Sequence, residues 1–131
     1  RRVILCSSSD GATCSSDAGR WNGWLVFVDN NRNDSPDSGE VLRVGTISPT
    51  EVVVQGSQRI VDQGNRIRMG ADGLVRAATG SSAVLLQAKL SVCIVTASPA
   101  HNARELRIAS GGRPLIVQVD NDGACPTPSN S

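Results

Sequence analysis

Short apolar runs separated by turn residues constrain this chain more than any other feature. The clearest run is 23–29 (GWLVFVD), which is continuously apolar and rich in β-branched and aromatic side chains. Residues 83–89 fit either a helix or a strand by periodicity alone. Further runs of strand length cover 2–5, 41–44, 50–55, 65–69, 74–76, 90–96, 105–109 and 115–119. This pattern predicts a mainly β fold, an antiparallel two-sheet meander or sandwich-like domain with little or no helix.

The length and composition set the size and the content of the core. A chain of 131 residues is enough for one domain, and no internal repeat divides it, so we expect a single domain over 1–131. The aromatic residues are Trp21, Trp24 and Phe27. The core must therefore consist mainly of Val, Ile, Leu and Ala. The two tryptophans either fill this core, which we favour, or form an exposed aromatic platform.

Four cysteines in so short a chain indicate an oxidising compartment. Three pairings are possible, and we favour Cys6 with Cys14, closing a polar loop, and Cys93 with Cys125, tying a strand to the C-terminal tail. Zinc binding is the alternative. Seven residues separate the first two cysteines and thirty-one separate the last two, and this spacing matches no compact zinc signature.

The basic residues are twelve arginines and one lysine, Lys89, and the net charge is only +1. Such a charge provides no global field towards nucleic acid or anionic lipid. A local patch is the exception, because Arg104, Arg107 and Arg113 lie within ten residues around a Gly-Gly turn. Arginine suits phosphate recognition, so this hairpin is a candidate DNA-binding site. The alternative is a row of solvated arginines on the outer face of a strand.

The loop after 23–29 is rich in oxygen-bearing side chains. Calcium-ligand positions 1, 3, 5, 9 and 12 of a twelve-residue window are occupied by Asp29, Asn31, Asn33, Asp37 and Glu40. Asp34 stands where the EF-hand loop needs Gly, and the flanking segments are predicted strands. We therefore favour a polar turn in which Asp and Asn side chains bond the backbone, and keep calcium as the alternative.

Catalytic motifs are absent from the sequence. His101 is the single histidine and lies in a predicted loop. There is no nucleophile elbow, phosphate-binding loop, dinucleotide fingerprint or zinc-protease motif. We therefore expect a protein that acts by binding, without enzymatic activity and without a cofactor.

Several blocks together resemble the GspH/FimT family of minor pilins and pseudopilins. The N-terminal third reads RVILCSSSDGATC, then GWLVFVD with its Asp/Asn turn, then D-x-GEVLRV. The later blocks are IRMGADGLV, SVCIV and RELRIASGGRP. The resemblance covers nearly the whole chain, and the GWLVFVD block with its turn is its most specific part.

The resemblance implies a FimT/FimU-like minor pilin of type IV pilus assembly that docks on other minor and major pilins. Family members carry an N-terminal hydrophobic helix that anchors them in the inner membrane, with the globular domain in the periplasm and then in the extracellular pilus. No run of eighteen apolar residues occurs here, so we expect this helix to be missing and Arg1 to lie at or just after its end.

Two further functions stay open on the sequence alone. Some FimT-like proteins bind double-stranded DNA during natural uptake through a C-terminal G-R-x-R element. Gly112 and Arg113 match that element, but Leu115 replaces the second arginine. The other function is that of a type II secretion pseudopilin, which the resemblance also covers.

Overall fold

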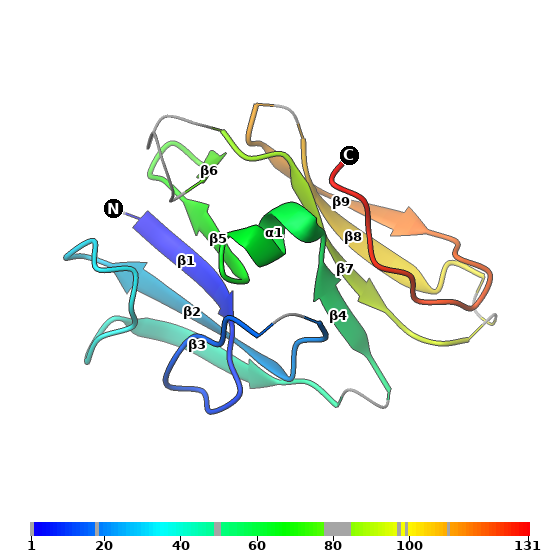
Figure 1. Ribbon diagram of the computed structural model, residues 1–131, viewed down its shortest axis with the longest axis horizontal. Helices are drawn as coiled ribbons and strands as arrows, with labels where there is room; N and C mark the ends of the chain where they lie inside the picture. Colours follow the sequence, from blue (N-terminus) through cyan, green and yellow to red (C-terminus); the bar gives the residue numbers. More distant parts are fainter. Residues whose placement is uncertain are drawn as a thin grey trace.

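The structure is a computed structural model that describes residues 2–17, 19–48, 51–77, 85–96, 98, 100–109 and 111–131. Its strands form two antiparallel sheets, one at each side of Figure 1. This confirms the predicted mainly β, two-sheet fold with little helix.

The first sheet has the strand order β3-β2-β1-β5-β6. Its strands are β1 (Arg2–Ser7), β2 (Gly23–Asp29), β3 (Val41–Thr46), β5 (Arg66–Met69) and β6 (Val75–Arg76). Residue Cys6 of β1 lies opposite Leu25 of β2 on one side and Arg66 of β5 on the other. β1 is therefore the central strand that joins the two halves of this sheet.

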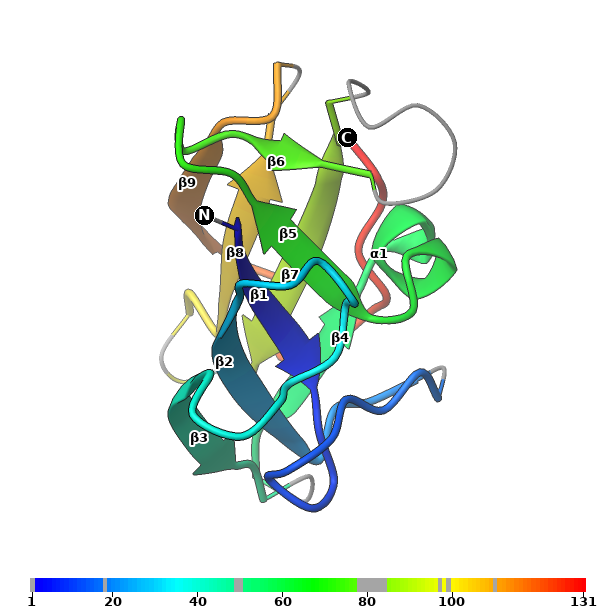
Figure 2. The same ribbon diagram turned by 90° about the vertical axis from the view of Figure 1, so that its left-hand side faces the viewer.

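The second sheet has the order β4-β7-β8-β9. Its strands are β4 (Val53–Gly56), β7 (Ala88–Cys93), β8 (Ala103–Ile108) and β9 (Pro114–Val119). The C-terminal tail after β9 folds back over this sheet and ends beside the helix (Figures 1 and 2). Gln55 holds the tail by donating to the carbonyls of Cys125 (3.1 Å) and Pro126 (3.0 Å).

A short helix, α1 (Gln58–Asp62), lies between the two sheets (Figure 1). The carbonyl of Ser57 accepts from Ile60 (2.9 Å) and Val61 (3.1 Å), and the Ser57 hydroxyl accepts from the Lys89 amide, which ties the helix to β7. Gly64 follows with a φ of 71°, a backbone conformation that suits glycine and ends the helix. The sequence analysis did not predict this helix, because only its buried Ile60 contributes to a core-facing pattern.

The main core lies between the sheets and is largely aliphatic. It contains Trp21, Val54, Ile60, Ile67, Val75, Leu86, Ala88, Leu90 and Ile108. Trp21 is 1% exposed, as the core interpretation predicted, whereas Trp24 is only partly buried and packs against the edge of this cluster.

Two smaller clusters surround the disulfides. Cys6 is bonded to Cys14, and Ile4, Leu25 and Phe27 pack around this bridge on the opposite face of the first sheet. Cys93 is bonded to Cys125, which anchors the tail over Val53, Ala103 and Val119. These are the two pairs that the sequence analysis favoured.

Two predicted strands are cut short at one end in the structure by more than one residue. The run 90–96 continues as a strand only to Cys93, because Ile94 enters a turn in which its carbonyl accepts from the amides of Thr96 (3.0 Å) and of the Asn102 side chain (2.8 Å). The run 50–55 begins late, because the amides of Glu51 and Val52 both donate to the Ser48 carbonyl in a turn. Within 83–89, the strand starts at Ala88; residues 78–84 lie outside the described part of the chain.

The two disulfides should contribute unequally to stability. Closing the 32-residue separation of Cys93 and Cys125 restricts the unfolded chain more than closing the 8-residue separation of Cys6 and Cys14. We expect Cys93→Ala/Cys125→Ala to lower the free energy of unfolding by about 3.7 kcal/mol and Cys6→Ala/Cys14→Ala by about 2.5 kcal/mol. Urea unfolding of the two double variants measures this order, and the reverse order would contradict it.

Candidate functional site

An open apolar groove begins between the two sheets and continues over the second sheet. It consists of two adjoining hollows of about 400 Å³ and about 530 Å³, and both are lined by Val52 and Val92. The first hollow is completed by Leu5, Trp21, Trp24, Val26, Ile47, Val54 and Leu90. The second is completed by Cys93, Ile94, His101, Asn102, Ala103, Arg104, Leu106 and Ile116. We call these two hollows together the groove.

Strand alternation explains why the groove is apolar and yet open. Leu25 and Phe27 of β2 are fully buried on the face that carries the Cys6–Cys14 bridge, so Trp24 and Val26 point to the opposite face and stay half-buried there. Val92 on β7 faces the groove from the other sheet and is 44% exposed. Apolar side chains from both sheets thus face a space that the chain itself does not fill.

The groove contains few polar groups. Arg104 and His101 lie at its outer end, and both are exposed. The indole Nε1 of Trp21 has no hydrogen-bond partner, but it is buried and does not face the open space of the groove. A surface of this composition suits an apolar protein segment rather than a highly charged ligand.

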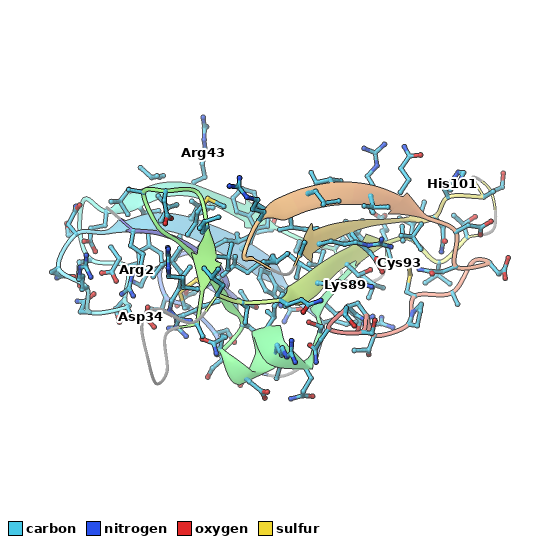
Figure 3. All side chains as sticks on the ribbon, turned by 90° about the horizontal axis from the view of Figure 1, so that it is seen from above. Arg2, Asp34, Arg43, Lys89, Cys93 and His101 are labelled. Carbon is cyan, nitrogen blue, oxygen red and sulfur yellow. A yellow bond between two sulfur atoms is a disulfide. The ribbon has the colours of Figure 1, made fainter. Side chains whose placement is uncertain are left out.

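A second polar site lies where the loop after β2 folds against the first sheet. Asp34 accepts from the Nε of Arg68 at 2.8 Å and also from its Nη2, and ion pairs join it to Arg2 (3.5 Å) and Arg66 (3.7 Å). Asp29 is buried and pairs with Arg2 at 2.5 Å. Figure 3 shows Arg2 and Asp34 close together at the end of the first sheet. We call Arg2, Asp29, Asp34, Arg66 and Arg68 the Asp34 cluster.

The Asp34 cluster has clear electrostatic consequences. Hydrogen bonding from Arg68 holds the pKa of Asp34 below its ordinary value, against the opposing effect of partial burial. Burial lowers the pKa of the Arg66 guanidinium, while the charge of Asp34 opposes this shift. Asp34 adopts a φ of 65°, which Asp tolerates better than most residues. The sequence analysis regarded Asp34 only as a misfit in a calcium loop and missed its role in fixing that loop.

The calcium candidates form an internal hydrogen-bond network in this loop. The carboxylate of Asp37 accepts from the side-chain amides of Asn31 and Asn33 at 2.7 Å each, and Glu40 accepts from the backbone amides of Asn30 and Asp37. Asp29 accepts from Asn33 and Asp34 amides in addition to Arg2. These are the contacts of a polar turn in which Asp and Asn side chains bond the backbone, and calcium binding by the loop stays a prediction. In the described residues, no group of three or more His, Cys, Asp or Glu is placed to hold a metal ion.

The three candidate DNA-binding arginines do not share one face. Arg104 and Arg107 are three residues apart on β8, so they point to opposite faces, and Arg104 lines the groove. Arg107 faces the tail side of the sheet and binds Glu105 at 3.0 Å. The hairpin register places Arg113 on the same face as Arg107, and Leu115 directly opposite Arg107. Only two of the three arginines can therefore act together.

Residues 1–123 match the model of the GspH family, described as type II transport protein GspH. No curated protein and no solved structure matches the chain. Among the described residues, no helix is long and apolar enough to cross a membrane.

The Asp34 cluster predicts a specific loss of stability at acid pH. Because the pKa of Asp34 is lowered by folding, its contribution is fully present above its ordinary pKa of 3.8 and disappears as the pH falls through the lower folded value. We expect Asp34→Asn to lower the free energy of unfolding by about 1–2 kcal/mol at pH 7, and this difference to shrink below pH 3.8.

Urea unfolding between pH 2 and pH 7 measures this difference. The matched control is Asp72→Asn, which removes an exposed ion pair with Arg76 and should have a smaller effect at pH 7. Equal effects of the two substitutions at pH 7, or a difference for Asp34→Asn that does not depend on pH, would contradict the role assigned to Asp34.

Proposed function

The chain belongs to the GspH family, and on this premise we propose that it is a minor pilin that takes part in type IV pilus assembly by docking on other pilins. Family membership gives it a pilin-like or pseudopilin-like role in a type II secretion or pilus system, and members of this kind are structural rather than enzymatic components. The observation that carries the docking proposal is the open apolar groove between the sheets.

The groove supports docking because of its exposed apolar side chains. Val92 is 44% exposed and Ile116 is 70% exposed, and both line it. Burying apolar surface contributes about 25 cal/mol for each Å² removed from water. An apolar segment of another pilin that covers these side chains would therefore form a complex stabilised by their burial.

The RVILC opening and the Gly112-Arg113 element favour the pilus branch over secretion. Under this proposal the domain is periplasmic, is held at the inner membrane by an N-terminal helix, and then enters the extracellular pilus. The oxidising conditions that its two disulfides need agree with that location. A type II secretion pseudopilin remains the alternative, and it would use the same groove for secretion partners.

DNA uptake has weaker support from the geometry. Arg107 is already paired with Glu105, Arg104 points to the other face of β8, and Leu115 takes the place of a further arginine. A DNA site would then depend on Arg113 with a partly neutralised Arg107. Binding of labelled double-stranded DNA that weakens with salt and is lost in Arg107→Ala/Arg113→Ala would favour this alternative.

A charged side chain placed in the groove should strongly weaken the binding of another pilin without unfolding the domain. We expect Val92→Glu to weaken binding to the purified globular domain of the major pilin at least about 30-fold, because an apolar partner would bury the new carboxylate. Val92 is 44% exposed, so the free domain should keep its melting temperature within a few degrees. Isothermal titration calorimetry measures the affinity.

The matched control is Val95→Glu, which places the same charge three residues away on a side chain that is 68% exposed and does not line the groove. This variant should bind like the wild type. Equal binding by Val92→Glu and the wild type would refute docking through the groove. If only a secretion pseudopilin domain binds in the same assay, and the major pilin does not, the secretion role replaces the pilus role.

A further inference from the structure

The outer edge of β9 is unpaired, and Pro114 at its start is its one residue without an amide proton for a further strand. β9 is the last strand of its sheet, and within the described part of the chain no strand pairs with its second side. Residues Pro114–Val119 carry no charge, and Leu115 (47%) and Ile116 (70%) are exposed. An exposed, uncharged, apolar edge of this kind readily accepts another strand.

The opposite edge of the protein provides a contrast. β3 also exposes apolar side chains, but Arg43 lies in its middle and points away from the sheet (Figure 3). The pairing of β3 with β2 also shifts register between Val26 and Phe27. A central charge and a bulge are two of the features by which proteins prevent edge pairing. β9 has neither feature, since its pairing with β8 is regular from Ala103 to Ile108.

The hydrogen-bond pattern shows which groups of β9 are free. The amide of Ala109 donates to the carbonyl of Arg113 at 3.0 Å, and the register continues through Arg107 opposite Leu115. Bonded pairs alternate along an antiparallel ladder, so Leu115, Val117 and Val119 direct their backbone groups to β8. Ile116 and Gln118 therefore direct their amides and carbonyls outwards.

We infer that a second copy of this chain pairs with β9, edge to edge and antiparallel, about a two-fold axis through Val117. In this register Ile116 of each copy lies opposite Gln118 of the other, and both pairs exchange N–H···O=C bonds. A register centred on Ile116 would instead place Gln118 opposite Pro114, which has no amide proton to donate.

The side chains of β9 are self-complementary in this register. On one face Val117 meets Val117 of the second copy, and Leu115 meets Val119. Beyond the strand, the exposed Arg113 of one copy lies near the exposed Asp120 and Asp122 of the other. The strand itself is uncharged, and the residues flanking its two ends carry opposite charges. In an antiparallel pair each positive end lies beside a negative end, so these charges favour an antiparallel second copy.

Disulfide capture tests the register directly. The two Val117 residues would form a pair without backbone hydrogen bonds, with Cα atoms about 4.5 Å apart, within the range of a disulfide. The four native cysteines form two intramolecular disulfides, so they do not compete with an introduced cysteine for cross-linking. We expect Val117→Cys to yield a covalent dimer as its main product under mild oxidation, on a non-reducing gel.

The matched control is Leu115→Cys on the same strand and the same face. In the proposed pair, position 115 of one copy lies opposite position 119 of the other. The two introduced cysteines would therefore be four residues apart along the strands, about 13 Å, and this variant should form no covalent dimer. Equal cross-linking of both variants, or none with Val117→Cys, would overturn the proposed register.

A proline tests whether the edge itself makes the contact. The Gln118 amide points outwards, so Gln118→Pro should remove the contact and leave the bonds to β8 intact. Sedimentation equilibrium up to about 1 mM should show a dissociation constant at least about 10-fold higher than that of Gln118→Ala, which keeps the amide. Equal constants, or a wild type that is monomeric throughout, would overturn the proposal. Val92→Glu should leave this dimer unchanged, so failure here and failure of groove docking are distinguishable.

Discussion

The arrangement of the two sheets depends on how few large side chains lie between them. Trp21 and Ile60 fill one end of the space, and α1 brings Ile60 there only because Gly56 has no side chain: a Cβ at that position would lie 2.7 Å from Cγ2 of Ile60. The other aromatic side chain at this place, Trp24, is only partly buried and lies along the wall of the groove, so it does not fill the remaining space. Val52 and Val92 line the groove from the side of the second sheet, and Leu5 and Val26 line it from the first. The groove is therefore a direct consequence of an aliphatic core, and it leaves exposed the apolar surface that a partner can cover.

The other face of the second sheet is partly covered by the chain itself. Cys125 brings the tail to β7, and Asn102 holds it there by donating to the carbonyl of Ala124 at 3.0 Å. On the same face, Glu105 forms ion pairs with Lys89 and Arg107. Because the tail occupies this face, the apolar surface that remains accessible on the second sheet is the groove and the edge of β9. A covalently anchored tail thus decides which surfaces are available for interactions.

The sequence predicted the fold more fully than it predicted the sites. The runs around β2, β8 and β9 were recognisable because their apolar content and the turns beside them are local properties. The helix α1 was missed because it is too short for a periodic pattern and is stabilised by Ser57 bonding to the distant Lys89. The groove was missed because it is formed by side chains from both sheets, such as Trp24 and Val92, that only the tertiary structure brings together. The separation of Arg104 from Arg107, by contrast, follows from strand parity alone, because residues three apart on a strand point to opposite faces.

The distribution of arginines explains why the apolar surfaces, rather than a basic patch, carry the proposed interactions. Arg2, Arg66 and Arg68 converge on Asp34, Arg76 binds Asp72, and Arg107 binds Glu105. In the described part of the chain, the ion pairs leave out six arginines: Arg20, Arg32, Arg43, Arg59, Arg104 and Arg113. No strand or helix carries more than one of them, so no single element presents a row of such arginines to a phosphate backbone. Three arginines thus fix the loop after β2 through Asp34, and the uncovered aliphatic side chains remain for contact with other proteins.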